Sequence, residues 1–266
     1  MLAAMDLGDL LERLWIDYAA ITPQAKAIHA LLQARGETIV NDHIALRTFA
    51  DPRIGLEVLA APFLAAGYRP AGVYRFHDKK LDARHYEPPD PALPKLFISE
   101  LRLLDCSLNL QTIVADLLAQ LPSNWRPFVA LDRPWSVSHA TVERLRHESE
   151  YAAWLAAHGI RANHFTVQIN ALRTLPTLES MVAFLQAHHI PLNTAGGIIK
   201  GSPEQLLEQC STIADTVDVP FTDGLHTVPG CYYEFARRHR DGDGELFHGF
   251  IEGSADKIFE STDRAR

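Results

Sequence analysis

Cysteine is scarce in this chain. Only three of its 266 residues are cysteine, at Cys106, Cys210 and Cys231, and no two of them form a CxxC pair. A small, odd number of widely spaced cysteines argues against a disulfide framework and is typical of proteins in a reducing compartment. The sequence therefore predicts free thiols and a cytoplasmic location.

Long apolar runs are absent as well. No stretch reaches the about 18 consecutive apolar residues that a membrane-spanning helix needs. The first segment, residues 1–14, mixes apolar residues with Asp6, Asp9, Glu12 and Arg13, which indicates an amphipathic helix rather than a signal peptide. We therefore expect neither a membrane-embedded part nor a cleaved leader.

Positive charge is in the minority. The 25 lysine and arginine residues face 33 aspartate and glutamate residues, so the net charge is −8. A chain with this balance has no general attraction for nucleic acid or for anionic membranes, although a local arginine can still bind a small anion. The hydrophobic fraction of 47% and the charged fraction of 22% are typical of a globular protein and argue against a disordered, collagen-like or coiled-coil chain.

The order of predicted elements repeats along the chain. An N-terminal helical segment over about 5–35 is followed by a strand, a helix and several strands, and roughly the same order then returns. His43 and His164 each begin a predicted strand just after a helix that a glycine ends. We therefore predict one domain with two weakly similar α+β halves, about 36–140 and 141–255. Two unrelated strands that both begin with histidine are the alternative.

Four local predictions matter for the later argument. Apolar spacing predicts one or two helices over 7–35 and a single helix over 141–158. A serine N-cap followed by proline predicts a helix over about 202–212. The segment 246–251 is predicted to be the last strand.

Histidine, by contrast, is abundant, with 13 residues, and it is the commonest metal ligand. In the predicted strand HIALRTF, alternation places His43, Ala45 and Arg47 on one face, while Ile44 and Leu46 point into the core. Arg47 lies about 13 Å along the strand from His43 and can lean back to bind an anion held near the histidine. A solvent-exposed face is the alternative.

A second predicted strand, HFTVQIN, also has a polar face. Its alternation places four polar side chains together, namely His164, Thr166, Gln168 and Asn170. Such a face lines either a polar cavity or solvent. The apolar residues between them are predicted to pack in the core.

A third segment, CYYEFARR, places Glu234 on the same face as Tyr232, with Tyr233 and Phe235 on the other face. A carboxylate among aromatic residues is costly to bury without a partner. A metal ion or an arginine would supply that partner. A glutamate on an edge strand facing water is the alternative.

Together, His43, His164 and Glu234 would supply two imidazoles and one carboxylate from three strands. This is the ligand set of non-heme Fe(II) oxygenases, and it also fits catalytic zinc. From the residues alone, a zinc-dependent hydrolase or isomerase is therefore an alternative. A non-catalytic module that binds a small molecule is another.

The glycine-rich segment GGIIKGS is a weaker candidate. A phosphate-binding loop needs lysine directly after the second conserved glycine, whereas Lys200 here precedes Gly201. Lys200 and nearby backbone amides can still be presented to a carboxylate. A purely structural turn is the alternative.

Four segments taken in order, HIALRTF, HFTVQIN, GGIIKGSPEQLLEQCS and PGCYYEFARR, resemble the 2-oxoadipate dioxygenase/decarboxylase family over about residues 5–250. The resemblance implies an α+β fold of the vicinal oxygen chelate type, in which a curled, mostly antiparallel β-sheet encloses a metal and helices flank it. It implies His43, His164 and Glu234 as metal ligands and Arg47 as the substrate-binding arginine. The best-described members of the family are much longer, so the resemblance implies that this chain is a short form.

The resemblance also implies the reaction. An enzyme of this family uses Fe(II) and O2 to convert a 2-oxo dicarboxylic acid, 2-oxoadipate, into 2-hydroxyglutarate and CO2. Lys200, Gln168 and Ser211 are expected to be further substrate contacts. The ligand set also accepts Zn or Ni in a purified sample, and the chain is expected to form a homodimer if it associates at all.

Overall fold

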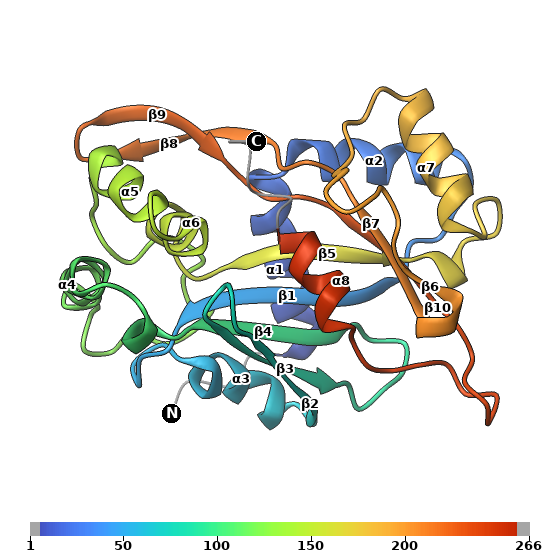
Figure 1. The fold of residues 1–266 in the computed structure, drawn as a ribbon, viewed down its shortest axis with the longest axis horizontal. Helices are drawn as coiled ribbons and strands as arrows, with labels where there is room; N and C mark the ends of the chain where they lie inside the picture. The colour runs from blue at the N-terminus through green and yellow to red at the C-terminus, as the bar shows by residue number, and fades with distance from the viewer. Residues whose placement is uncertain (1–5, 260–266) are drawn as a thin grey trace.

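An eight-stranded sheet runs through the centre of the structure, a computed structural model that describes residues 6–259 (Figure 1). The strands are β1 (Asn41–Phe49), β2 (Arg69–Phe76), β3 (Leu81–Glu87), β4 (Lys95–Leu101), β5 (Ala162–Gln168), β6 (Lys200–Ser202), β7 (Leu207–Ser211) and β10 (Glu234–Arg238), with β8 (Thr216–Phe221) and β9 (Gly224–Pro229) forming a separate hairpin. The helices are α1 (Leu7–Ala20), α2 (Pro23–Ala34), α3 (Leu56–Ala65), α4 (Leu108–Leu118), α5 (His139–Arg146), α6 (Glu150–His158), α7 (Leu178–Ala187) and α8 (Glu252–Phe259). Residues 1–5, part of the predicted N-terminal segment, lie outside the described residues. No helix within residues 6–259 combines the length and the hydropathy needed to cross a membrane.

The strand pairing is the same on both sides of the central antiparallel pair, β1 and β5. On one side β1 pairs in parallel with β4, and β3 and β2 follow in antiparallel orientation. On the other side β5 pairs in parallel with β10, and β7 and β6 follow in antiparallel orientation. The topology thus repeats in the way that two α+β halves, at 36–140 and 141–255, would produce. That the domain consists of two weakly similar halves stays a prediction.

The sheet curls into a half-barrel. Helix α8 contacts β2 and β6, the first and last strands of the sheet order, so one helix bridges the two edges. Helix α1 packs on β5, α3 on β4, and α7 on β7 and β10, whereas α8, red in Figure 1, crosses the other side of the sheet. The predicted α+β fold with a curled, mostly antiparallel sheet is confirmed.

Because side chains alternate along a strand, each strand residue faces either the helices outside the curled sheet or the space inside it. Ile44, Leu46, Phe165 and Val167 are at most 1% exposed and face outward, where the ring of Tyr18 on α1 lies 5.0 Å from that of Phe165. Burying a side chain of this size stabilises the fold by about 1.5–3 kcal/mol. The prediction that the apolar residues of both histidine-containing strands form the core is confirmed.

The single helix predicted over 141–158 is wrong, because two helices occupy this segment. Helix α5 ends at Arg146 and α6 begins at Glu150. The Ser149 hydroxyl accepts a hydrogen bond from the Ala152 amide, so an N-cap interrupts a segment whose apolar spacing is continuous. The helical prediction for the N-terminal segment is confirmed by α1 and α2.

The helix predicted over 202–212 is also wrong. Ser202 caps only the short 3-10 turn Pro203–Gln205, and Leu206 then takes a left-handed conformation with φ of 65°. The chain continues as β7, which pairs with β10 and buries each of its residues. Pairing within the sheet therefore overrides the local signal for a helix start.

The strand predicted over 246–251 is absent from the structure. This segment instead lies against the sheet through Arg238, whose guanidinium donates hydrogen bonds to the carbonyl oxygens of Phe247 and Gly249 at 3.0 and 2.8 Å. A side chain thus satisfies backbone groups that a neighbouring strand would otherwise pair. Helix α8, which the sequence did not indicate, follows directly.

His158 is a buried histidine that the fold keeps neutral. Its Nε2 donates a hydrogen bond to the Pro229 carbonyl at 2.7 Å, which attaches the β8–β9 hairpin to α6. Burial lowers the pKa of His158 from 6.5 to about 3, so between these values the unfolded chain binds a proton that the folded chain does not. The free energy of unfolding is therefore expected to fall as the pH decreases from about 6.5 toward 3, by up to about 1.4 kcal/mol per pH unit.

Urea unfolding at about pH 7.5 and about pH 5.5 measures this effect. His158→Gln retains a donor for Pro229 and is expected to lose less stability on acidification than the parent. The control is His226→Gln, a partly exposed histidine in the same hairpin, which is expected to keep the parent's pH dependence. An identical loss of stability in the parent and in His158→Gln would contradict the prediction.

Candidate metal centre

Three neighbouring strands place His43, His164 and Glu234 on the inner face of the sheet. His43 on β1 lies opposite Thr166 on β5, and Glu234 on β10 pairs with the same threonine. His164 lies two residues before Thr166, so its side chain points to the same face. The strand order β1–β5–β10 therefore brings together residues that are far apart in the sequence.

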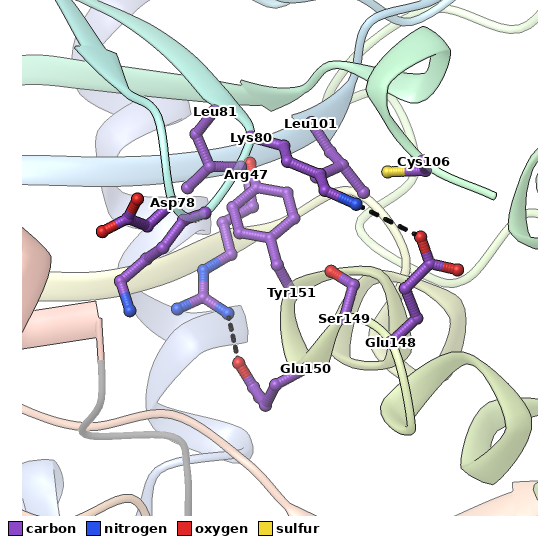
Figure 2. A pocket seen from close by; sticks show the side chains of 11 residues that line it. Arg47, Asp78, Lys80, Leu81, Leu101, Cys106, Glu148, Ser149, Glu150 and Tyr151 are labelled. Atoms are coloured by element: carbon purple, nitrogen blue, oxygen red, sulfur yellow. Dashed lines mark hydrogen bonds and ion pairs between the residues drawn. The ribbon is translucent and has the colours of Figure 1, made fainter.

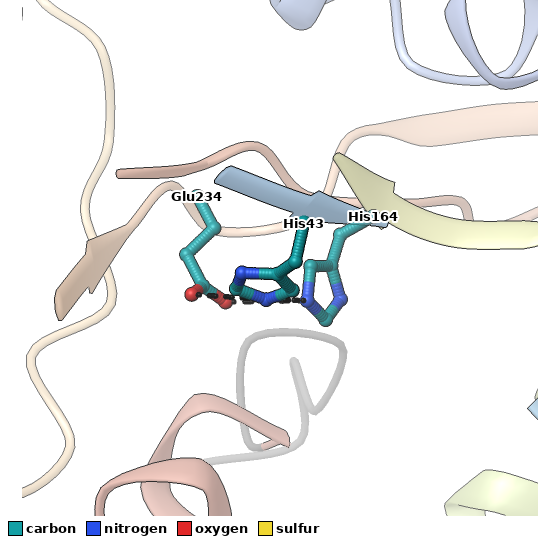
Figure 3. Close-up of side chains that lie close together, drawn as sticks. All are labelled: His43, His164 and Glu234. Carbon is teal, nitrogen blue, oxygen red and sulfur yellow. Dashed lines mark hydrogen bonds and ion pairs between the residues drawn. The ribbon is translucent and has the colours of Figure 1, made fainter. Parts of the chain in front are cut away.

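The three side chains converge on one point (Figure 3). The Nε2 atoms of His43 and His164 are 3.4 Å apart, and the Glu234 carboxylate oxygens lie 3.6 Å from His43 Nε2 and 3.3 Å from His164 Nε2. One ligand atom from each residue lies within 4.8 Å of the others, and all three residues are buried. Two imidazole nitrogens and a carboxylate oxygen at this spacing can hold one metal ion.

The electrostatics of the site also suit a cation. Burial and the neighbouring His43 hold the pKa of His164 well below its ordinary value, so its ring is neutral, the form that binds metals. Burial raises the pKa of Glu234, although His43 and a 2.6 Å hydrogen bond from Gln209 oppose the shift. A buried carboxylate is costly unless a positive charge pairs with it. A bound metal ion would supply that charge, so the residues present fit a metal.

Neighbouring side chains fix the orientation of both imidazole rings. His43 Nδ1 donates to Asp42 Oδ1 at 2.8 Å, and His164 Nδ1 donates to Asn163 Oδ1 at 3.1 Å. In each case the partner directly precedes the histidine in the chain. With Nδ1 as the donor, Nε2 of each ring carries the lone pair that faces the common point.

Asp42 is itself held by a buried arginine. Nε and Nη2 of Arg238 donate to the two carboxylate oxygens of Asp42 at 2.7 and 2.9 Å. Although burial opposes ionisation, Arg238 and the His43 ring keep the pKa of Asp42 well below its usual range. The chain Arg238–Asp42–His43 therefore keeps this carboxylate charged and the imidazole oriented.

Replacing Asp42 by asparagine is expected to weaken metal binding by about 10- to 100-fold, because the variant loses the charge that orients His43. Calorimetric titration of the metal-free protein with Zn²⁺ measures the affinity. The matched control is Asp17→Asn, which removes a carboxylate on α1 that lies 3.4 Å from Arg161. The control is expected to bind metal like the parent, and the same result for Asp42→Asn would refute a supporting role for Asp42.

Little space remains in front of the triad. The cavity there has a volume of about 20 Å³, which is room for about one water molecule. Besides the triad, the lining residues are Phe97, Gln209, Tyr232, Phe250 and Ile258. Phe250 lies edge-on to the His43 ring at 4.8 Å, and Ile258 belongs to α8, so the C-terminal part of the described chain covers the site.

Arg47 lies on the inner face of β1, the same face as His43, as predicted. It is 1% exposed, so the solvent-exposed alternative is wrong. Its guanidinium lies 3.6 Å from the Glu150 carboxylate and stacks over the rings of Tyr151 and Trp154 at 5.0 and 5.2 Å. Figure 2 shows it pointing toward Glu150 beside a cavity of about 190 Å³. The charge of Arg47 also lowers the pKa of His164, so it acts on the triad.

Lys200 shares the inner face, because it pairs with Gln209 across β6 and β7. It is buried, and its ammonium donates hydrogen bonds to the carbonyl oxygens of Asn193 and Ile198 at 2.6 and 3.3 Å. In this structure Lys200 therefore holds the backbone of the glycine-rich segment.

Ser211 and Gln168 also lie on the inner face, at different depths. Ser211 is fully buried and pairs with Glu234 across β7 and β10. Gln168 lines another cavity, together with Asp42 and Arg238. Ser211 is therefore adjacent to the triad, whereas Gln168 faces the neighbouring hollow.

Two supporting residues escaped the sequence analysis. Gln209 would have been found if 207–211 had been predicted as a strand, because alternation then places it on the face of Ser211. Asp42 directly precedes His43, but its arginine partner is 196 positions away. No local pattern indicates such a long-range pair.

Comparison with known proteins places this geometry in a family. The family model described as 2-oxoadipate dioxygenase/decarboxylase matches residues 6–123 and 128–241. The chain is 33% identical over 279 residues to the chloroplastic 2-oxoadipate dioxygenase/decarboxylase of Arabidopsis thaliana, with 92% of this chain and 74% of that protein covered.

Solved structures agree with this match. The hydroxyglutarate synthase of Oryza sativa, in complex with 2-oxoadipate, is 31% identical with a TM-score of 0.91, covering 98% of this chain and 95% of that one. A protein from Shewanella frigidimarina NCIMB 400 is 47% identical with a TM-score of 0.88, covering 93% and 98%.

The fold is also shared more widely. A protein from Ralstonia eutropha JMP134 described as belonging to the glyoxalase superfamily has a TM-score of 0.73 at 24% identity, covering 91% of this chain and 84% of that one. The predicted vicinal oxygen chelate type of fold is thus confirmed. On the family match and the identity to its curated relatives, the chain is an oxidoreductase that belongs to the 2-oxoadipate dioxygenase/decarboxylase family.

Proposed function

We propose that this protein is an Fe(II)-dependent dioxygenase/decarboxylase that converts 2-oxoadipate and O2 into 2-hydroxyglutarate and CO2. The observation that carries the proposal is the convergence of His43, His164 and Glu234, whose ligand atoms lie within 4.8 Å of one another in a buried site. Family membership and the 2-oxoadipate complex of the Oryza sativa relative support the choice of substrate.

His43, His164 and Glu234 would hold the metal, and two imidazoles with one carboxylate are the ligand set of non-heme Fe(II) oxygenases. Bound Fe(II) supplies a Lewis acid for the 2-oxo acid and an electron source for O2. The protein residues orient both rings, keep the His164 ring neutral and exclude bulk water. The same ligands accept Zn or Ni, because affinity alone does not select iron.

Arg47 would bind a carboxylate of the substrate, since a guanidinium can pair with a carboxylate through two parallel hydrogen bonds. Glu150 lies 3.6 Å from its guanidinium in this structure. Ser211, beside Glu234, and Lys200 are proposed as further contacts, and Gln168 as a more distant one. A six-carbon acid needs more than the about 20 Å³ in front of the triad, so we expect lining side chains such as Phe250 and Ile258 to move when it binds.

The test is O2 uptake by the Fe(II)-loaded protein, with CO2 release followed in parallel, against a panel of 2-oxo acids. 2-Oxoadipate is expected to give equal amounts of O2 consumed and CO2 released, and 2-oxohexanoate, which lacks the second carboxylate, is expected to react poorly. Turnover that persists without O2 would indicate a hydrolase or isomerase instead. Less than about a tenth of an equivalent of metal after loading would indicate a non-catalytic binding module.

Two further predictions concern the cellular location and the oligomeric state of the enzyme. We propose a cytoplasmic location, because the three cysteines are all free thiols and free thiols persist in reducing compartments. A homodimer is the proposed assembly if the chain associates. Sedimentation of the purified protein measures the second point directly.

A further inference from the structure

Tyr232 contacts the metal triad without being part of it. Its side chain is fully buried, and its ring stacks on the His164 imidazole with centroids 4.7 Å apart and planes at 26°. It also lines the small cavity in front of His43, His164 and Glu234. A stacked phenol of this kind limits how the His164 ring can rotate.

The hydroxyl of Tyr232 belongs to a residue that lines the triad cavity. It is buried, and within residues 6–259 it has no hydrogen-bond partner. Buried hydroxyl groups in folded proteins are nearly always hydrogen-bonded, because leaving one unpaired is costly. An unpaired hydroxyl at the wall of a ligand cavity therefore points to a partner that arrives with the ligand.

The other residues around the cavity indicate what that partner is. Apart from the triad and Gln209, the other side chains that line the cavity, Phe97, Phe250 and Ile258, are apolar. A ligand oxygen held in front of the triad would therefore meet few other donors. A phenol can donate a hydrogen bond to such an oxygen, and the bond is strong when the oxygen is anionic.

We infer that Tyr232 is a substrate-binding residue whose hydroxyl donates a hydrogen bond to a carboxylate oxygen of the 2-oxo acid held in front of the triad. The inference rests on the proposed function, because it takes the ligand to be a 2-oxo dicarboxylic acid. It assigns to one residue two tasks, namely packing His164 and recognising the anion. Phenylalanine at this position would keep the first task and lose the second.

The neighbouring Tyr233 supplies a matched control. It is equally buried, and its hydroxyl likewise has no hydrogen-bond partner within the described part of the chain. Its ring, however, packs in the outer core, 6.0 Å from Trp15 and 5.3 Å from Phe235. Tyr233→Phe removes the same atom from the same kind of environment, on the opposite face of the segment.

The experiment is calorimetric titration of the Zn(II)-loaded protein with 2-oxoadipate, because zinc has no redox chemistry and the ligand is not consumed. Tyr232→Phe is expected to bind 2-oxoadipate about 10- to 100-fold more weakly than the parent, the range for a hydrogen bond to a charged group. Tyr233→Phe is expected to bind it like the parent. Zn²⁺ affinity is expected to be unchanged in both variants.

Each outcome has a distinct meaning. Equal 2-oxoadipate affinity in the parent and in Tyr232→Phe overturns the inference, and so does a loss of Zn²⁺ affinity in Tyr232→Phe, which would assign the hydroxyl to the metal site. If the parent binds metal but no 2-oxo acid, the proposed function itself fails, and the inference fails with it.

Discussion

Glu234→Gln is expected to abolish metal retention and O2 consumption while leaving the fold intact. Glutamine has the same shape and can still accept the hydrogen bond from Gln209, but it lacks the one negative charge of the triad. Loss of a supporting residue at a metal site costs about 10- to 100-fold in affinity, so loss of a ligand is expected to cost more than 100-fold. Metal content after dialysis, followed by O2 uptake, measures both effects.

The same variant makes a second prediction for the metal-free protein. Burial raises the pKa of Glu234, which means that its charge is unfavourable without a cation, so Glu234→Gln is expected to be at least as stable to urea as the metal-free parent. The control is Glu208→Gln, a buried glutamate on β7 that pairs instead with His239 at 2.8 Å. Glu208→Gln is expected to retain metal. If Glu234→Gln also retained metal, the triad would not be the metal site.

The second large effect is expected from Arg47→Met. Methionine can pack against Tyr151 and Trp154 but cannot pair with a carboxylate. Truncating one partner of a buried, hydrogen-bonded charge pair costs about 2–5 kcal/mol, so the affinity of the Zn(II)-loaded protein for 2-oxoadipate is expected to fall by at least about 30-fold. Metal affinity is expected to change much less than the affinity for 2-oxoadipate, since Arg47 is not a ligand.

The pairing of Arg47 with Glu150 requires a second variant to separate binding from stability. Arg47→Met also removes the charge that lies 3.6 Å from Glu150, and this is expected to destabilise the fold. Adding Glu150→Gln is expected to restore stability but not the affinity for 2-oxoadipate. If the double variant regained affinity, the weak binding of Arg47→Met would reflect a disturbed fold rather than a lost contact.

Alternation along the chain was enough to predict much of the inner face. In β1 and β5, a period of two separated His43, Arg47 and His164 from Ile44 and Phe165, and burial on opposite faces of the sheet follows that division. The choice of Glu234 came from its aromatic neighbours and from the family resemblance. Which strands lie side by side was not predictable from alternation, because pairing is decided by contacts between distant segments.

The predictions that the structure contradicts share a physical cause. Ser202 and Pro203 carry a helix-start signal, yet the segment that follows pairs within the sheet and forms β7. Strand β3 lies in a stretch for which no element was predicted, and its polar residues are explained only by the strands on either side. Helix α8 covers the metal site, but its sequence does not differ from that of a surface helix. Local propensity is weak wherever tertiary pairing decides the structure.

The repeated strand pairing has a consequence for the metal site itself. His43 and His164 are each the third residue of their strands, and two residues further on Ala45 and Thr166 pair in parallel with Phe97 and Glu234. Phe97 on β4 is thus the counterpart of Glu234 on β10, a phenyl ring where the other half has a carboxylate. Phe97 lines the cavity in front of the triad, so the half that contains β4 would add a hydrocarbon wall, and no fourth protein ligand, to an ion held by the triad.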